Sequence, residues 1–119
     1  MRICIPTYGW NGLEDEVCEH FGRAPTYTII DLETNNVEII PNLGVHMGGG
    51  RRPAEILVSH KINVVVCSNL GRKALALLGQ YGIKVYIGAR GRVKDALNDW
   101  KAGKLMLATE NTVCKEGHY

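Results

Sequence analysis

The stretch INVVVCSNLGRKALALLGQYGIKVYIG, Ile62 to Gly88, decides the fold because its hydrophobic period changes twice within a short distance. Residues 63–67 and 83–87 are continuous apolar runs of the kind found in buried strands. Between them, residues 71–82 repeat with the spacing of an amphipathic helix, and residues 91–104, GRVKDALNDWKAGK, predict another helix. Strands joined by a crossover helix lie parallel in one sheet, so this half of the chain predicts a β-α-β-α unit.

The first half predicts three further strands, at residues 2–6, 26–33 and 36–41, and a helix over residues 51–61. The second and third strands are joined by a hairpin turn, so only the second strand runs against the others. The prediction is an α/β fold with a mixed, mostly parallel five-stranded sheet and flanking helices. Residues 1–105 are expected to form one domain, and residues 106–119 a C-terminal tail that is either an extra strand or loosely ordered.

Composition limits the classes of partner. The chain has 119 residues and a formal net charge of only +2, which argues against a broad basic face for nucleic acid. It has no apolar run long enough to span a membrane and no signal-like start, so we expect no membrane partner and a cytoplasmic location. The four cysteines are scattered and form no C-x-x-C motif, which fits a reducing compartment.

The predicted topology brings four connecting segments to one edge of the sheet, where open α/β sheets bind ligands. The dipeptide Gly-Arg occurs four times, and each copy falls in or directly beside one of these segments: Gly22-Arg23, Gly50-Arg51, Gly71-Arg72 and Gly91-Arg92. Helix N-termini and arginine side chains both favour anions, so this edge predicts an anion site. The alternative is that glycine marks the strand-to-helix turns and arginine only solvates them.

Side chains that bind soft metals occur in the same segments. Cys18 and His20 form a C-x-H pair in the first segment, and His46 precedes the triple glycine of the second. Imidazole and thiolate suit iron, copper and iron-sulfur species better than magnesium or calcium. Cys4 and Cys67 are interpreted as core residues of buried strands, and the C-x-x-x-H pair Cys114 and His118 is a weak metal signal.

Two motifs resemble the dinitrogenase iron-molybdenum cofactor-binding family. The stretch GLEDEVCEHFGRAPTYTIIDLE resembles the family's acidic segment followed by H-F-G-R-A, and VHMGGGRRPAEIL resembles its H-x-G-G-G loop. The resemblance continues to G-x-V-x-x-A-L near residue 97 and covers about residues 1–105. The resemblance implies that the fold contains a ribonuclease H-like motif. It also implies that the protein is a small stand-alone member of the family and is not an enzyme. Such a protein would bind, carry or store an anionic metal-sulfur cluster, an iron-molybdenum cofactor or related cluster of iron, molybdenum and sulfur.

The resemblance also implies the site and its partners. The metal ligands would be His20 and His46, with Cys18 as a further candidate that stands where the family commonly has serine. The matched motifs carry over Gly22, Arg23, Gly48, Gly49, Gly50, Gly71 and Arg72 as cluster contacts. This chain adds Arg51 beside the triple glycine and Asn69, an amide in a turn where the family commonly has a glycine-rich sequence. Cluster-assembly proteins, in nitrogen fixation or outside it, would be the protein partners.

Two other classes of function fit the residues to different degrees. A ribonuclease H-type enzyme needs several carboxylates at the strand ends to hold paired magnesium ions, and the first strand ends in Pro6 and Thr7. A module that binds phosphate or another small anion, or that regulates a partner protein without a metal cluster, stays open because helix starts rich in glycine and arginine also suit phosphate.

Overall fold

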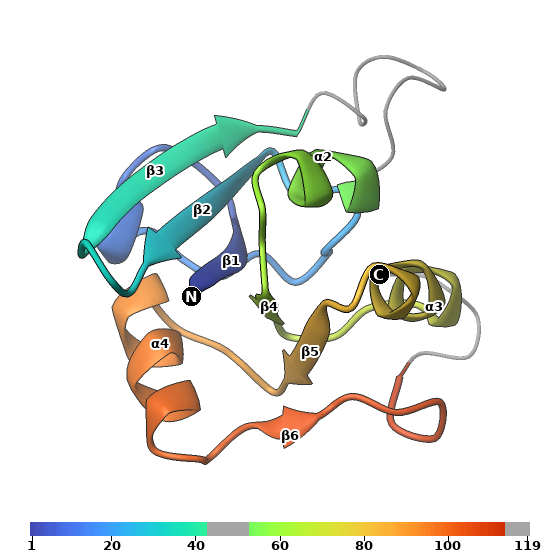
Figure 1. The fold of residues 1–119 in the computed structure, drawn as a ribbon. Helices are drawn as coiled ribbons and strands as arrows, with labels where there is room; N and C mark the ends of the chain where they lie inside the picture. Colours follow the sequence, from blue (N-terminus) through green and yellow to red (C-terminus); the bar gives the residue numbers. More distant parts are fainter. Residues whose placement is uncertain (43–52, 114–119) are drawn as a thin grey trace.

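The computed structural model describes residues 1–42 and 53–113 of the chain and contains one mixed sheet with helices on both faces (Figure 1). The strands are β1 (Arg2–Thr7), β2 (Thr26–Asp31), β3 (Asn36–Pro41), β4 (Val64–Val66), β5 (Lys84–Ile87) and β6 (Met106–Leu107). The helices are η1 (Gly12–Glu14), a single 3-10 turn, and α2 (Pro53–Ser59), α3 (Arg72–Gln80) and α4 (Val93–Lys101). The mixed α/β class, the five predicted strands and the three predicted helices are therefore confirmed.

The sheet order is β3-β2-β1-β4-β5-β6. It corrects the predicted number of strands and the predicted proportion of parallel pairs. Among the first five strands only β2 runs against the others, as expected. The sheet nevertheless has six strands, and the pairs β1-β2, β2-β3 and β5-β6 are antiparallel, so most neighbouring pairs are antiparallel. The prediction of a mostly parallel five-stranded sheet is wrong because the chain returns after α4 and adds β6 beside β5. The ribonuclease H-like motif stays a prediction.

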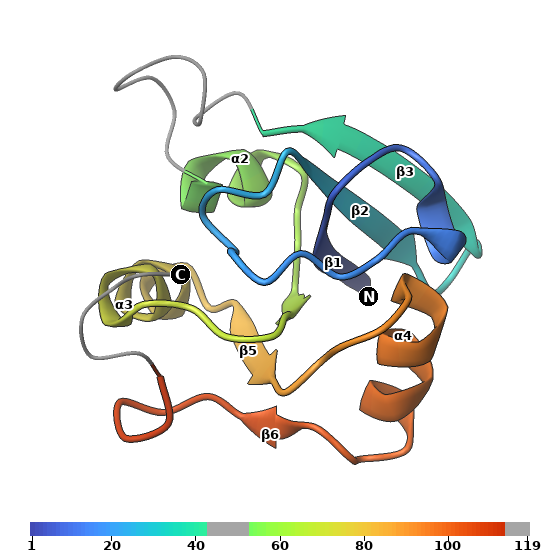
Figure 2. The same cartoon turned by 180° about the vertical axis from the view of Figure 1, so that it is seen from behind.

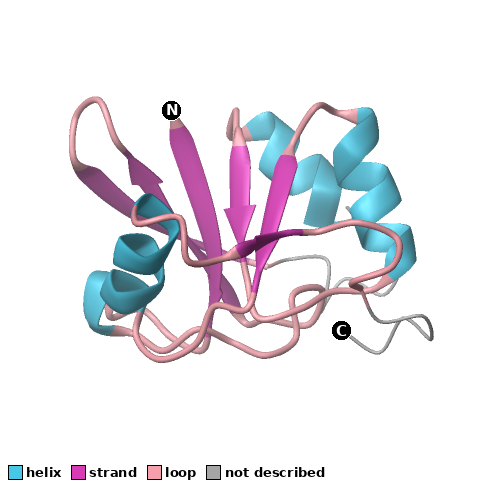
Figure 3. Ribbon diagram, turned by 90° about the horizontal axis from the view of Figure 1, so that it is seen from below, coloured by secondary structure: helices cyan, strands magenta, loops and turns pink. Residues whose placement is uncertain are grey.

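Alternating side chains of the central strands build a core on each face of the sheet. Cys4, Val65 and Val85 point to the face covered by α2 and α3, where they pack with Leu57 and Leu78. The intervening residues Ile3, Ile5, Val64 and Val66 point to the opposite face and pack against α4 through Val93, Ala96 and Leu97. Burial of each large aliphatic side chain contributes about 1.5–3 kcal/mol, so both layers stabilise the sheet. Figure 3 shows helices on both sides of the strands.

The loops that follow β1, β4 and β5 gather at one end of the sheet, opposite the N-terminus (Figure 3). This position follows from the parallel pairing of β1 with β4 and of β4 with β5, because parallel neighbours end on the same side. The arrangement confirms a common end for Gly22, Gly71 and Gly91, whereas Gly50 lies outside the described residues. In residues 1–42 and 53–113, none of the helices has the length and apolar character needed to cross a membrane.

Candidate functional site

The loop after β1 crosses the end of the sheet before the chain enters β2 (Figure 2). Two backbone hydrogen bonds hold it there: Cys18 N donates to Pro6 O at 2.8 Å, and Val17 N donates to Gly91 O at 2.9 Å. The loop then forms a turn at residues 21–23, in which Phe21 is buried and Arg23 is exposed. This geometry places the H-F-G-R segment at the end of the sheet where β4 and β5 also finish.

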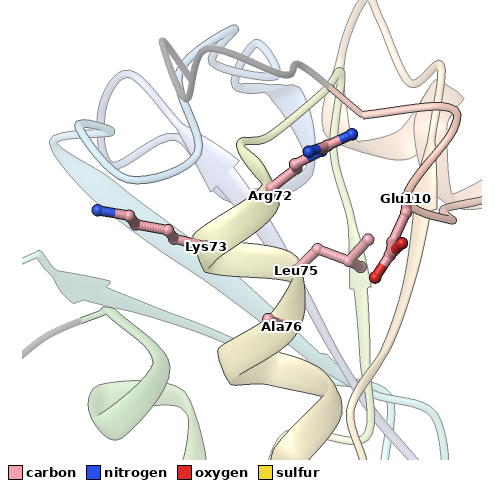
Figure 4. Close-up of a pocket in the computed structure, with 5 residues that line it drawn as sticks. All are labelled: Arg72, Lys73, Leu75, Ala76 and Glu110. Carbon is pink, nitrogen blue, oxygen red and sulfur yellow. The ribbon is translucent and has the colours of Figure 1, made fainter.

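The N-terminus of α3 supplies a second part of the same end. Gly71 caps the helix with extended backbone, φ −81° and ψ 164°, and no side chain accepts a hydrogen bond from the first turn. The free N–H groups and the helix dipole favour an anion at this position. A cavity of about 420 Å³ adjoins this turn and is lined by Arg72, Lys73, Leu75, Ala76 and Glu110. In Figure 4 the side chains of Arg72 and Lys73 point away from each other, and Leu75 points toward Glu110.

The arginines at this end are not equivalent. Arg92 caps α4, and its guanidinium lies 3.5 Å from the Glu14 carboxylate, which Lys94 also contacts at 2.9 Å. The hydrogen bond from Lys94, with the charges of Lys94 and Arg92, holds the pKa of Glu14 below its usual range. Asp95 accepts a hydrogen bond from the Arg92 backbone N–H, so acidic groups already occupy the start of α4. Gly91-Arg92 therefore begins a helix as predicted but is used within the protein.

Three other arginines keep their charge available at this end. In the part of the chain that the structure describes, Arg23, Arg72 and Arg90 are exposed and form no ion pair with a carboxylate. Arg23 follows β1 and Arg72 follows β4, which is the strand hydrogen-bonded to β1. Arg23 lies late in the connection from β1 to β2, just before β2 begins, and Arg72 lies at the start of α3, so both exposed guanidinium groups belong to connections at this end of the sheet. Planar multi-donor groups of this kind recognise multiply charged anions.

The predicted metal ligands have different environments. His20 is exposed in the loop after β1, whereas Cys18 is 2% exposed and its thiol donates to the carbonyl oxygen of His20 at 3.7 Å. Cys18 packs within the core beside α2 and α3, so ligation by its thiolate requires the loop to move. No group of three or more His, Cys, Asp or Glu side chains within residues 1–42 and 53–113 is placed to hold a metal ion.

The structure supports the core assignment of the two strand cysteines. Cys4 and Cys67 are both fully buried free thiols. Burial raises the pKa of Cys67 to about 12, and burial together with the nearby Cys67 raises the pKa of Cys4 well above its usual value. Both side chains therefore stay protonated at neutral pH, and a protonated thiol is a poor metal ligand.

Of the remaining predicted contacts, some lie among the described residues and the others lie outside them. Asn69 is half-buried before α3, where its side-chain oxygen accepts a hydrogen bond from Leu70 N at 2.8 Å and its amino group faces no acceptor among the described residues. Gly22 lies with Arg23 in the 21–23 turn before β2, and Gly71 lies with Arg72 at the start of α3. His46, Gly48, Gly49, Gly50 and Arg51 lie outside the described residues.

Sequence reasoning missed two residues that contact the 21–23 turn from inside. Tyr27 and Asn42 are both fully buried, and both hydrogen-bond to backbone carbonyls of this turn. In the sequence, Tyr27 fits the apolar pattern of an ordinary buried strand, and Asn42 is a residue type common in loops. The only available signal was a polar residue directly after a strand, which is too common to single out.

Comparison with known proteins places this geometry in a family. An uncharacterized protein of Methanocaldococcus jannaschii is 32% identical over 111 residues, covering 88% of this chain and 89% of that protein. A Thermotoga protein solved by NMR, with a provisional NifB designation, is 33% identical with a TM-score of 0.81 and covers 98% of both chains. The apo orange protein of Desulfovibrio gigas is 27% identical with a TM-score of 0.80, covering 91% of this chain and 92% of its own. The family model described as dinitrogenase iron-molybdenum cofactor matches residues 1–103, and the chain belongs to that family.

Proposed function

We propose that the protein binds and carries an anionic metal-sulfur cluster, of the iron-molybdenum cofactor or precursor type, without catalysing a reaction on it. The observation that carries this proposal is that two arginines in connections at the same end of the sheet are exposed, and neither is paired with a carboxylate among the described residues: Arg23 lies between β1 and β2, and Arg72 begins α3 after β4. The family supports a role in handling the cofactor of nitrogen fixation.

The physical basis is charge and hydrogen bonding. A metal-sulfur cluster carries several negative charges on sulfide groups, which accept hydrogen bonds from guanidinium and backbone N–H donors. The uncapped first turn of α3 adds such donors beside Arg72. His20, exposed on the same loop as Arg23, would ligate an exposed metal through a neutral imidazole, and His46 would supply the second ligand. Asn69, Gly22, Gly71 and the segment Gly48–Arg51 would complete the contacts.

Cys18 is a conditional ligand in this proposal. Its thiol packs in the core and donates to the His20 carbonyl, so the free protein presents His20 and not Cys18 to the ligand. A rearrangement of residues 18–20 on binding would be needed to bring the thiolate to the metal. Cluster-assembly proteins in a reducing cytoplasm are the proposed source and destination of the cargo.

The decisive experiment is anaerobic purification of the protein from its own source, followed by elemental analysis and visible absorption. A cluster carrier should contain metal and sulfide and should be brown or orange. Titration of the metal-free protein with tetrathiomolybdate, the simplest molybdenum-sulfur anion, should then show saturable binding that inorganic phosphate does not displace. A colourless protein that holds phosphate and does not bind tetrathiomolybdate would instead support the small-anion module.

Two variants test the ligand assignment. His20→Ala should reduce tetrathiomolybdate binding by the folded protein, because the imidazole that would ligate the metal is exposed on the loop after β1. Cys67→Ser, matched in size but buried in the core, should lower stability and leave the affinity of the folded fraction near that of the wild type. Loss of binding in Cys67→Ser with full binding in His20→Ala would contradict the histidine assignment and favour a thiolate site.

A further inference from the structure

A buried polar pair lies directly behind the turn that carries Arg23. The Tyr27 hydroxyl donates to the carbonyl oxygen of Phe21 at 2.8 Å. The Asn42 side-chain amino group donates to the carbonyl oxygen of Gly22 at 3.0 Å and to the Tyr27 hydroxyl at 3.2 Å. Two consecutive carbonyls of the turn are therefore held from inside the protein by one connected network.

The direction of these hydrogen bonds follows from the chemistry of the groups. The Gly22 carbonyl can only accept, so the amino group of Asn42 must face it, and the Tyr27 hydroxyl that donates to Phe21 is left to accept from Asn42. Burial raises the pKa of Tyr27, with nearby thiols adding to the effect, so its hydroxyl remains a donor at all physiological pH values.

This arrangement has a cost that stability alone does not explain. The side-chain oxygen of Asn42 is buried and accepts no hydrogen bond from the described residues. A buried amide oxygen without a partner is unfavourable, and an apolar residue of similar shape would avoid that penalty. The amino group of Asn42 thus holds the Gly22 carbonyl, while the side-chain oxygen of Asn42 is left without a hydrogen bond. A fold that accepts this penalty indicates that a fixed position of the turn is important for function.

The network is attached to two neighbouring strands of the sheet, β2 and β3. Tyr27 belongs to β2 and its ring packs against Phe21 with centroids 5.5 Å apart. Asn42 follows β3, and its backbone N–H donates to Pro25 O at 3.0 Å, which closes the loop against the sheet. Both residues are inaccessible to solvent, whereas His20 and Arg23, on either side of the held carbonyls, are exposed.

We propose that Tyr27 and Asn42 are positioning residues, which hold the carbonyls of Phe21 and Gly22 so that His20 and Arg23 are presented together to an anionic ligand. Neither residue touches the ligand. The inference rests on the proposed function for the nature of that ligand, but the held turn is a property of the protein alone. Its effect on binding is preorganisation, because a turn that is already ordered loses less conformational freedom when an anion binds.

The test uses Tyr27→Phe, which removes one hydroxyl and keeps the buried ring, and Asn42→Ala, which removes the amide. Tyr86→Phe is the matched control, since Tyr86 is half-buried on β5 and packs on Trp100 at the other face of the sheet. Carbonyl carbon shifts of Phe21 and Gly22 report the hydrogen bonds, and the heteronuclear NOE of Gly22 and Arg23 reports fast motion of the turn. Tetrathiomolybdate titration measures binding, with Arg23→Ala as reference.

Tyr27→Phe and Asn42→Ala should shift the carbonyl resonances, lower the heteronuclear NOE at the turn, and weaken tetrathiomolybdate binding about fivefold to tenfold, while Tyr86→Phe changes none of these. Unchanged shifts and NOE values would overturn the inference whatever the affinity. If Arg23→Ala weakens binding, the turn takes part in binding; a lower NOE in Tyr27→Phe and Asn42→Ala with unchanged affinity would then also overturn the inference. If the wild-type protein binds no tetrathiomolybdate, the proposed function fails by itself, and the NMR data still decide whether these residues hold the turn.

Discussion

At the residue scale, the same dipeptide performs different tasks in different loops. Arg92 is paired with Glu14 beside Lys94, so its charge is satisfied within the protein. Arg23 and Arg72 have no such carboxylate partner among the described residues, although both follow a glycine just as Arg92 does. The sequence pattern alone therefore overstates the anion site by counting a structural arginine.

This difference predicts the outcome of arginine-to-lysine exchanges. Arg23→Lys and Arg72→Lys keep the charge but lose the planar fork, so tetrathiomolybdate binding should weaken about fivefold to tenfold in each. Arg92→Lys is the control, and it should bind as the wild type does because Arg92 already serves Glu14. Isothermal titration calorimetry at constant ionic strength measures the three constants. Equal affinity in all variants would mean that these arginines supply only a general positive potential.

At the element scale, the connection between β5 and α4 fixes the loop after β1. Gly91 accepts a hydrogen bond from Val17 N at 2.9 Å, and Val93 N donates to Asp15 O at 2.8 Å. Gly91 has φ +80°, a backbone conformation that residues with a side chain rarely adopt. The turn between β5 and α4 thus needs glycine at position 91, and its hydrogen bonds fix the position of the loop after β1.

Replacing this glycine should therefore lower stability. In Gly91→Ala the new methyl group would meet the Asp95 carboxylate at 3.4 Å in an unfavourable backbone conformation. We expect the free energy of unfolding to fall by about 1–2 kcal/mol. Gly79→Ala is the matched control, because Gly79 is exposed in α3 and the added carbon would meet no atom within 4 Å beyond its chain neighbours and the backbone of its own helix. That substitution should raise stability by about 0.5–1 kcal/mol. Urea unfolding followed by circular dichroism measures both, and a stable Gly91→Ala protein would contradict the argument.

At the scale of the whole molecule, a cluster of stabilising contacts around Arg2 lies at the end of the sheet opposite the proposed anion site. Arg2, at the start of β1, donates from its guanidinium to His60 O at 2.8 Å. It also forms ion pairs with Asp31 at 3.4 Å and Glu38 at 3.3 Å, which join β1 to β2, β3 and the chain after α2. The loops proposed to bind the anion follow the other ends of β1 and β4, so the two sets of contacts lie at opposite ends of these strands.

The separation predicts that Arg2→Leu affects stability and not binding. The variant loses a partly buried hydrogen bond and two ion pairs, and the free energy of unfolding should fall by about 1–2 kcal/mol. Tetrathiomolybdate affinity of the folded protein should stay within about twofold of the wild type, because sites this far apart act independently. Urea unfolding and calorimetric titration of the same preparation measure the two effects. A large loss of affinity would show that the two ends are coupled.

The sequence by itself determined the helices and most of the strands, and it determined that the loops after β1, β4 and β5 share one end of the sheet. Strand and helix periods reflect burial within a few neighbouring residues, so they predicted β1 to β5 and α2 to α4 with small errors at the ends. The alternation of strands and helices placed the loops that contain Gly22, Gly71 and Gly91 at one end of the sheet, because β1, β4 and β5 are parallel and finish on the same side.

Only the tertiary structure decided which side chains have partners. Strand β6 has two residues, Met106–Leu107, too few for a period, and it exists because β5 offers an edge. The pair Arg92 and Glu14 joins residues 78 positions apart, and the bonds from Asn42 and Tyr27 to the turn depend on β2 and β3 bringing both residues behind it. Hydrogen bonds and ion pairs form between groups that the fold brings within a few ångströms, and local sequence patterns do not encode that distance.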